Sequence, residues 1–396
     1  MLFSIDMDNP FTPGFGTQPT ILAGREETTT LFSEALASEK PHPSNAILLA
    51  GQRGVGKTVM LDELGNAARE KGWHVIDVTA DKGSEWLDEL ASSVAAEIRE
   101  RDPEGRSISG VSVLRGLFAI DFSDKPKSEW TPKLRELLQA LLDTCAQTDS
   151  PHFNTGIMVT LDEVQTANLE EVRRFGKIFQ HLSNREELPL KFACAGLPSI
   201  DTALLKDKKK STFLSRLDRH KLGRFSDEQA RYVLAETAAT AQAKFTPAAL
   251  ESAVSTAQGS PYLLQLIGFH SWRAAEKRKG SVAEVETSDV LQGVEVSKRK
   301  FADEVTSLAW GDLTTVQRSF VLAMALDDGP SRTLDIAHRL GKEQNYVSPY
   351  RRALINADVI YSPRNSYVDF VDRDFRAFVR NEDEFVEYQT LNTTTS

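Results

Sequence analysis

Apolar residues follow two alternating patterns over the first half of the chain. Short runs of strand length occur at residues 46–50, 74–78, 156–161 and 190–195, each bounded by polar residues or glycine. Between them, segments such as Glu85–Arg99 place apolar side chains at the spacing of an amphipathic helix. Strands that alternate with helices in this way predict a parallel, doubly wound α/β sheet.

The pattern changes beyond about Arg224, where strand-like runs stop. Ser226 with Gln229 has the form of a capping box that opens a helix. The pairs Thr246–Pro247 and Ser260–Pro261 each combine an N-cap residue with proline at the first helical position. We therefore expect an all-helical domain after the α/β domain.

A third pattern occupies residues 312–380. Helical periodicity fits 314–325, 332–340 and 344–357, and two short β-like runs, VIYS and SYVDFV, follow with PRN between them. Three helices and a two-stranded wing are typical of winged-helix modules.

The N-terminal stretch NPFTPGFGTQPTILAGREE is rich in proline and glycine and has little periodicity. It predicts an extended arm that becomes ordered against the domain following it. The chain then divides into five parts: an arm and adjoining segment (1–44), an α/β domain with an insertion at about 101–130 (45–224), a helical lid (225–311), a winged-helix domain (312–381) and an acidic, polar tail (382–396).

Composition narrows the class of protein. The chain has 396 residues, with 40% hydrophobic and 26% charged residues, which is near the average of globular proteins. Its net charge of −10 argues against non-specific coating of nucleic acid. No apolar window reaches the length of a membrane span, and Cys145 and Cys194 lack metal-ligand spacing. We expect a protein of the reducing cytoplasm without membrane attachment.

The segment Gly51–Thr58, GQRGVGKT, lies between an apolar strand and a predicted helix. This spacing is typical of a phosphate-binding loop, whose backbone N–H groups point at the phosphates. Lys57 would reach the β- and γ-phosphates, and the Thr58 hydroxyl would bind Mg²⁺. The predicted ATP or ADP site comprises Gly51, Gln52, Arg53, Gly54, Val55, Gly56, Lys57, Thr58 and Val59.

A second motif lies at Ile157–Glu163, IMVTLDE, an apolar strand that ends in two carboxylates. Asp162 would hold the Mg²⁺ through water, and Glu163 would polarise an attacking water as a general base. The predicted metal site is therefore Thr58 with Asp162, and the predicted catalytic residues include Lys57 and Glu163. The two motifs together are similar to the additional-strand, catalytic-glutamate (ASCE) branch of P-loop NTPases. That branch places a further strand between them, for which residues 74–78 are a candidate.

The order of these parts resembles AAA+ ATPases, and more narrowly the origin-recognition-like and archaeal-type ATPases of bacteria and archaea. The resemblance covers about residues 9–380. The phosphate loop and the DE pair are specific only to the superfamily. The segments LAGREE and GSPYLLQLIGFHSW narrow the resemblance to this smaller group. It implies an ATP hydrolase with an α/β P-loop domain, a helical lid and a winged helix.

The resemblance also implies contacts around the nucleotide base. Ile21 and Leu22 would flank the adenine, Arg25 would lie near it, and Pro261 stands where many AAA+ lids place an arginine. The local alternative is a simple turn before a helix, with Arg25 paired to a nearby carboxylate.

Family members carry an arginine just before the lid that reaches the γ-phosphate of a neighbouring subunit. Arg216 has the matching SR context in FLSRLDRHKLGRF, with Arg219 as a second candidate. The alternative is a surface ion pair with Asp218 or Asp227.

Two departures bear on the rate of hydrolysis. The strand KFACAGLPS lacks the polar residue that usually orients the attacking water at its end, and the lid helix begins GSPY without an arginine. The GxPY form resembles signal-transduction ATPases with numerous domains, which act mainly as switches. The resemblance therefore implies ATP binding with slow turnover.

The third winged-helix segment and the wing tip carry polar and cationic side chains that suit contacts in a DNA groove. Residues 312–380 contain ten Lys or Arg (318, 332, 339, 342, 351, 352, 364, 373, 376, 380) and nine acids (312, 327, 328, 335, 343, 358, 369, 372, 374), so a protein-docking role fits as well. The candidate contact residues are Lys342, Gln344, Asn345, Tyr346, Ser348, Tyr350, Arg351, Arg352, Arg364 and Asn365.

Three functions stay open at this point. The first is an ATPase, homo-oligomeric in its ATP state, that controls assembly on double-stranded DNA or with a protein client. The second is a signalling switch that retains nucleotide and releases an effector. The third is a helper ATPase for transposition or phage defence.

Overall fold

The computed structural model describes residues 9–393 apart from a set of gaps, and the insertion predicted at about 101–130 lies almost entirely in one of them. The described residues form two compact units, Met1–Gly24, Gln52–Gly56 and Gly223–Ser396 in the first, and Arg25–Gly51 and Lys57–Leu222 in the second. The residues not described are 1–8, 15, 39, 82, 84, 102–132, 148–155, 185–186, 199, 201–212, 214–215, 358 and 394–396.

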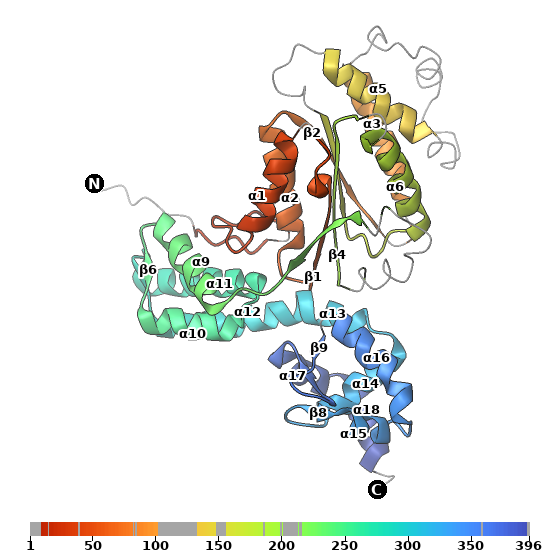
Figure 1. Cartoon of the computed structure of the whole chain (residues 1–396). Helices are drawn as coiled ribbons and strands as arrows, with labels where there is room; N and C mark the ends of the chain where they lie inside the picture. The colour runs from red at the N-terminus through yellow and green to blue at the C-terminus, as the bar shows by residue number, and fades with distance from the viewer. Residues whose placement is uncertain are drawn as a thin grey trace, which may run out of the picture. The chain divides into compact units, whose positions relative to one another are not determined.

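The second unit is built on a five-stranded parallel sheet, with strand order β2-β3-β4-β1-β5 (Figure 1). Strands β1, β3 and β4 are buried along their whole length, as expected for a parallel sheet with both faces covered. This confirms the predicted P-loop NTPase sheet. The strands are β1 (Ala46–Gly51), β2 (Trp73–Thr79), β3 (Gly156–Asp162), β4 (Leu190–Gly196) and β5 (Asp218–Leu222).

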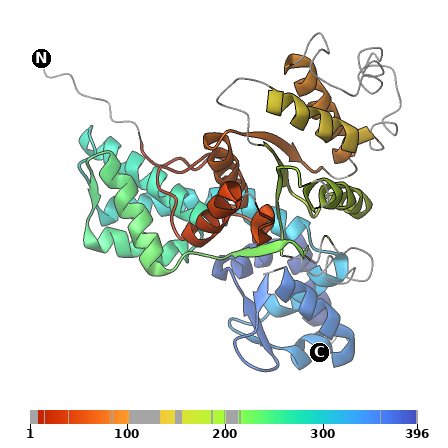
Figure 2. The same ribbon diagram turned by 45° about the horizontal axis from the view of Figure 1, so that its top comes forward.

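Helices cover both faces of this sheet. Figures 1 and 2 show α1 and α2 on one face and α3, α5 and α6 on the other. The second face has an aromatic centre, where the rings of Phe175 and Phe192 lie 4.8 Å apart and Trp86 contacts Phe175. The helices are α1 (Glu26–Ala37), α2 (Lys57–Glu70), α3 (Trp86–Arg101), α5 (Leu134–Gln147) and α6 (Leu169–Asn184), and a 3₁₀ turn, η1 (Pro43–Asn45), precedes β1.

The strand between the two sequence motifs is not the one predicted. Strand β4 lies between β1 and β3, whereas β2, which contains residues 74–78, lies at the edge of the sheet. Chain order does not reveal this because parallel strands are joined by crossovers that can skip a neighbour. Strand β5, whose first three residues are half-buried and whose last is buried, was not predicted.

The first unit contains the predicted lid. Its helices begin at the predicted caps, because Ser226 and Gln229 form a capping box and Thr246 and Ser260 cap their helices. Strands do not stop at Arg224, since two-residue strands β6 and β7 pair within the lid. The elements are α9 (Asp227–Thr240), β6 (Lys244–Phe245), α10 (Pro247–Ala257), α11 (Pro261–Lys279), β7 (Glu284–Val285), α12 (Thr287–Phe301), a π-helical segment η4 (Ala302–Thr306) and α13 (Ser307–Gly311).

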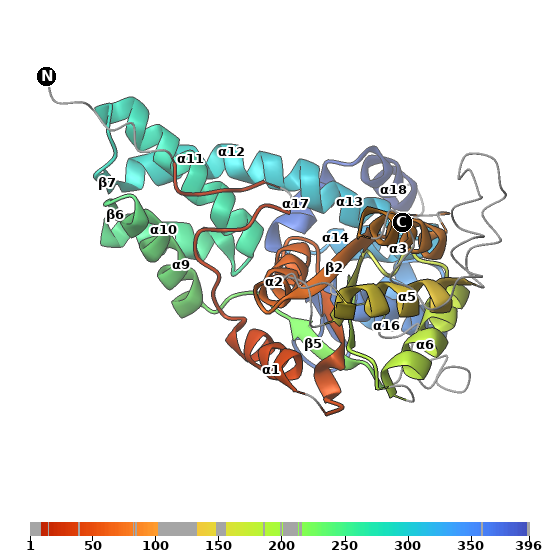
Figure 3. The same ribbon diagram turned by 90° about the horizontal axis from the view of Figure 1, so that it is seen from above.

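The N-terminal arm belongs to the first unit and packs on the lid helices. Figure 3 shows it alongside α11. Phe11 is 1% exposed, and its ring contacts those of Phe245 and Trp272. Asn9 donates a hydrogen bond to the carbonyl of Phe269. The arm therefore contributes to the lid core, which its irregular sequence does not indicate.

The last part of the first unit is a winged helix. Its strands form a three-stranded sheet in the order β8-β10-β9, one strand more than predicted, because Ser331–Arg332 pairs with the wing. The elements are α14 (Thr315–Ala325), β8 (Ser331–Arg332), α15 (Thr333–Arg339), α16 (Gln344–Asn356), β9 (Ile360–Tyr361), β10 (Tyr367–Phe370), α17 (Arg373–Arg380) and α18 (Asp383–Thr393).

The predicted polar tail is in fact helical over α18. Phe385 is buried in the winged-helix core, and the Tyr388 hydroxyl donates a hydrogen bond to the carbonyl of Arg339. Two apolar or amphipathic side chains in an acidic segment are enough to attach it. Across the described part of the chain, no helix is both long enough and apolar enough to cross a membrane.

Candidate functional site

The loop Gln52–Gly56 joins β1 to α2. Gly54 and Gly56 have positive φ angles of 76° and 87°, which side chains disfavour. A β-carbon on Gly54 would also lie 3.4 Å from the Tyr262 side chain of the same unit. The turn therefore favours glycine at position 54 for its conformation, since the contact with Tyr262 is of ordinary van der Waals length. Val55 is buried, whereas Gln52 and Arg53 are half-buried.

The two sequence motifs meet in the second unit. Thr58 donates a hydrogen bond of 2.6 Å from its hydroxyl to Oδ2 of Asp162. The other carboxylate oxygen of Asp162 accepts one of 2.7 Å from the backbone N–H of Glu163. Lys57, at the first turn of α2, is buried, with 7% exposed. Residues 104 positions apart thus form one polar cluster at the carboxyl ends of β1 and β3.

Negative charge gathers around this cluster. Burial, followed by the charges of Asp77 and Asp162, raises the pKa of the Asp62 carboxyl above its usual value. Asp62 lies one helical turn after Thr58. A nearby cation would relieve this repulsion, so the cluster favours a bound positive charge.

The donor set fits Mg²⁺ as P-loop sites hold it. Thr58 and Asp162 offer one hydroxyl and one carboxylate on adjacent elements, and Mg²⁺ in such sites takes its other ligands from phosphates and water. Among the described residues, no group of three or more His, Cys, Asp or Glu side chains is arranged to hold a metal by itself. The metal would therefore bind together with the nucleotide.

Glu163 is held by a residue that the sequence analysis missed. Its backbone has a positive φ of 53°, and its Oε2 accepts a hydrogen bond from the side-chain amide of Gln165. The amide oxygen of Gln165 accepts a bond of 3.0 Å from the backbone N–H of Leu197, just beyond β4. Gln165 thus connects the candidate base to the strand end that lacks a polar side chain. No sequence pattern indicates this role, because it depends on the tertiary approach of Leu197.

Residues 21–191 match the AAA ATPase domain family. The matched range includes both the phosphate loop and the DE pair. Residues 303–379, which include most of the winged helix, match a family described only as a domain of unknown function, DUF8462. A search of curated proteins finds no match to the chain. The chain therefore contains a nucleotide-binding ATPase domain, in agreement with the P-loop and DE motifs.

Solved structures share the fold of the whole chain. A Walker-type ATPase of Pyrococcus abyssi matches with a TM-score of 0.61 at 18% identity, covering 94% of this chain and 99% of that one. The ORC2 protein of Aeropyrum pernix, solved in ADPNP and ADP complexes, matches with a TM-score of 0.65 at 14% identity, covering 97% of this chain and 98% of that one. At these identities the matches show a shared fold over most of the chain.

The residues predicted around the adenine are distributed over both units. Ile21 packs against the lid core, next to buried Ala23. Arg25 occupies the N-cap position of α1 in the AAA ATPase domain, and burial lowers the pKa of its guanidinium despite the charge of neighbouring Glu26. Leu22 is half-buried.

Pro261 starts α11, and the next residue contacts the phosphate loop within the first unit. The backbone N–H of Tyr262 donates a hydrogen bond of 3.1 Å to the carbonyl of Gly54. The Tyr262 hydroxyl donates to a carboxylate oxygen of Glu304 in η4. The lid helix thus contacts the loop through backbone, which no side-chain pattern could predict.

Both candidate arginines before the lid are among the described residues. Arg216 is exposed, and Arg219 is a half-buried residue of β5. The predicted alternative of an ion pair between Arg216 and Asp218 does not form, because Asp218 accepts hydrogen bonds from Ser44 (2.6 Å) and pairs with His220 (3.0 Å). Arg216 therefore stays exposed beside the edge strand.

Proposed function

We propose that this protein is a slow ATPase switch that binds Mg-ATP at the phosphate loop and uses the bound state to control its assembly on double-stranded DNA. The observation that supports nucleotide binding is the hydrogen bond between Thr58, which directly follows the loop, and Asp162. Lys57 neutralises the β- and γ-phosphates, and Thr58 and Asp162 hold the metal. Bound Mg²⁺ supplies charge neutralisation at the transferred phosphoryl group.

Glu163 acts as the general base for the attacking water. Its Oε2 accepts a hydrogen bond from the Gln165 amide, so this oxygen is already engaged and is not open to the attacking water. At the end of β4, Ala195 and Gly196 offer no side chain to orient water. Both features support slow turnover, so that the ATP-bound state lasts long enough to act as a signal.

Ile21, Leu22, Arg25 and Pro261 flank the base and ribose of the nucleotide in this proposal. Arg216 reaches the γ-phosphate bound to a neighbouring copy, which makes the ATP state a homo-oligomer. This role is supported by the exposure of Arg216 just before the lid and by the absence of the predicted pair with Asp218 in the described structure.

The DNA part rests on the charge distribution of the winged helix. Within 342–365, four basic residues (342, 351, 352, 364) stand against two acidic ones (343, 358), although the whole domain is nearly balanced. Several acids elsewhere are used in internal ion pairs and so do not repel DNA. These pairs are Arg339–Asp327, Arg376–Asp369 and Arg380–Asp328.

The exposed side chains of α16 and the wing fit a duplex. Arg352 and Arg364 are exposed, and Arg364 lies 3.9 Å above the ring of Tyr367. Arg351 donates a hydrogen bond of 2.8 Å to the Ser362 hydroxyl at the base of the wing. Helix α16 would occupy the major groove, and the wing would contact phosphates.

ATP binding and hydrolysis, measured with and without duplex DNA, test the proposal. We expect Lys57→Ala to lose nucleotide binding and the double variant Arg352→Ala/Arg364→Ala to lose DNA binding with a salt slope reduced by about 2. Arg299→Ala, at an exposed arginine of α12, is the matched control. Nucleotide binding that survives Lys57→Ala contradicts the site, and DNA binding that survives the arginine pair contradicts the interface.

A signalling switch is a second candidate because the lid contacts the phosphate loop directly, from Tyr262 N–H to Gly54 O. A ligand that moves this loop would disturb α11 and its neighbours within the same unit. A monomer with retained nucleotide, negligible turnover and no DNA binding would favour this function over the first.

A further inference from the structure

A cavity of about 660 Å³ lies in the second unit, at the amino ends of its parallel strands. Asn45 directly precedes β1, Trp73 begins β2, and Lys191 is the second residue of β4. The phosphate loop follows the carboxyl end of the six-residue strand β1, which spans about 20 Å. The cavity is therefore separate from the candidate nucleotide site.

Lys191 is the central feature of this cavity. Only 4% of Lys191 is exposed, its ammonium donates a hydrogen bond of 2.5 Å to Oδ1 of Asn45, and it lies 5.2 Å from the ring centre of Trp73. Among the described residues it has no carboxylate partner, and burial alone lowers the pKa of its ammonium to about 8. A buried cation without an anion is costly, so an anionic ligand would stabilise it.

Trp73 forms a second wall of the cavity beside Lys191. It is 3% exposed, and its ring lines the cavity 5.2 Å from the Lys191 ammonium. The face of this ring suits an apolar or aromatic group attached to an anion.

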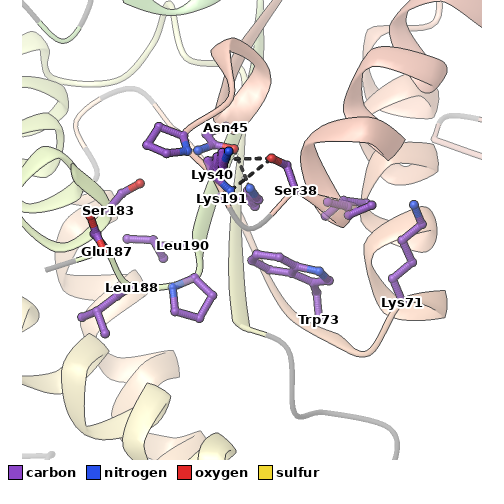
Figure 4. A pocket seen from close by; sticks show the side chains of 14 residues that line it. Ser38, Lys40, Asn45, Lys71, Trp73, Ser183, Glu187, Leu188, Leu190 and Lys191 are labelled. Atoms are coloured by element: carbon purple, nitrogen blue, oxygen red, sulfur yellow. Dashed lines mark hydrogen bonds between the residues drawn. The ribbon is translucent and has the colours of Figure 1, made fainter.

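The remaining charges have one dominant sign. Lys40 and Lys71 also line the cavity, and the Lys71 ammonium donates a hydrogen bond of 2.8 Å to the carbonyl of Ser33. Among the described lining residues, Glu187 is the one acid and there is no arginine. Figure 4 shows Lys40, Lys191 and Asn45 together near Ser38. Serine hydroxyls at positions 38 and 183 also line the cavity, and lysines act as point charges toward a phosphate.

We propose that this cavity binds a small phosphate monoester, with Lys191 as its principal cation. The volume lies within the range of small-molecule sites. Leu36, Pro41 and Leu188 give the same cavity apolar walls, which suit an organic group attached to the phosphate. No bond is made or broken in this proposal, and the ligand is held and released.

Calorimetric titration of the full chain with phenyl phosphate, inorganic phosphate and benzoate tests this. A Lys57→Ala background removes the contribution of the phosphate loop, so the result does not depend on the proposed ATP site. We expect phenyl phosphate to bind more tightly than inorganic phosphate, and benzoate to bind weakest. Lys191→Met should weaken phenyl phosphate about tenfold or more, because a charged hydrogen bond is lost.

Two further variants keep the test decisive if Lys191→Met folds poorly. Lys71→Gln, at the cavity wall, should weaken phenyl phosphate severalfold, and Lys244→Gln, at a lid lysine with 75% side-chain exposure, should leave it unchanged. Equal affinities in folded Lys191→Met, in Lys71→Gln and in the parent would overturn the proposal. Tighter binding of benzoate than of phenyl phosphate would overturn the phosphate assignment, and absent binding of all three probes would overturn the site.

Discussion

Thr58 and Asp162 are joined by a hydrogen bond of 2.6 Å from hydroxyl to carboxylate, although 104 positions separate them in the sequence. Both are second-unit residues, Thr58 at the amino end of α2 and Asp162 at the carboxyl end of β3. In the proposed function, this hydroxyl and this carboxylate are the protein ligands of the Mg²⁺ bound to ATP. The first prediction follows from this geometry.

Thr58→Ala should weaken ATP binding in the presence of Mg²⁺ by about tenfold and leave binding in EDTA nearly unchanged, because only the metal ligand is lost. Thr58→Ser keeps the hydroxyl and is the matched control. Calorimetry with and without Mg²⁺ measures both. An equal loss in EDTA would mean that Thr58 supports the fold of the loop and not the metal.

Gln165→Ala should raise basal ATP hydrolysis severalfold without changing ATP affinity. The substitution removes the hydrogen bond that engages Oε2 of Glu163, and the freed oxygen can then accept a hydrogen bond from the attacking water. Steady-state turnover and nucleotide affinity are the two measurements. If turnover falls instead, Gln165 assists hydrolysis by orienting the water, and its hydrogen bond to Glu163 does not slow the reaction.

Phe11→Ala should destabilise the first unit by about 3 kcal/mol or more, since a fully buried ring is removed from the lid core. Phe11→Leu should cost less because it fills part of the space. Gly268→Ala should also destabilise, because its β-carbon would lie 2.4 Å from the Phe11 ring. Chemical denaturation followed by circular dichroism checks this, and an unchanged transition would show that the arm is not part of the core.

The pH dependence of stability should report Lys191. Burial lowers its folded-state pKa to about 8 from 10.5, so the folded state disfavours the charged form. Below about pH 8, Lys191 is protonated in both the folded and the unfolded state, and the folded state bears the full cost of burying the charge. This cost is relieved as the pH rises from about 8 to 10.5, because the folded state loses the proton first. Relative to Lys191→Met, the wild-type free energy of unfolding should rise by about 2 kcal/mol between pH 7 and 9.5. A constant difference would contradict a buried, unpaired ammonium.

Much of the fold follows from local patterns. The caps at Ser226, Thr246 and Ser260 lie where the sequence predicts them, because a cap is a short-range interaction between a side chain and the next turn. The apolar runs of β1, β3 and β4 are equally local. Strand order is not local, and for that reason β4, and not β2, lies between the two motifs.

The residues of the candidate site also divide into those that local sequence predicts and those that depend on tertiary contacts. Glycines, Lys57 and the carboxylates can be predicted because phosphate and metal chemistry requires those residue types at fixed spacing. Gln165 and the Tyr262 contact could not be predicted, since an amide that bridges to Leu197 and a backbone N–H that meets Gly54 depend on tertiary approach. Phe11 is a similar case, as an aromatic residue in an irregular arm gives no periodic signal.

Mass photometry of Glu163→Gln on a defined duplex DNA, with ATP, with ADP and without nucleotide, tests the central claim most directly. The variant should bind ATP and retain it, so DNA-bound complexes larger than one chain should accumulate with ATP and not with ADP. Lys57→Ala should give the nucleotide-free distribution in every condition. Identical distributions of Glu163→Gln in all three conditions would contradict an ATP-controlled assembly on DNA.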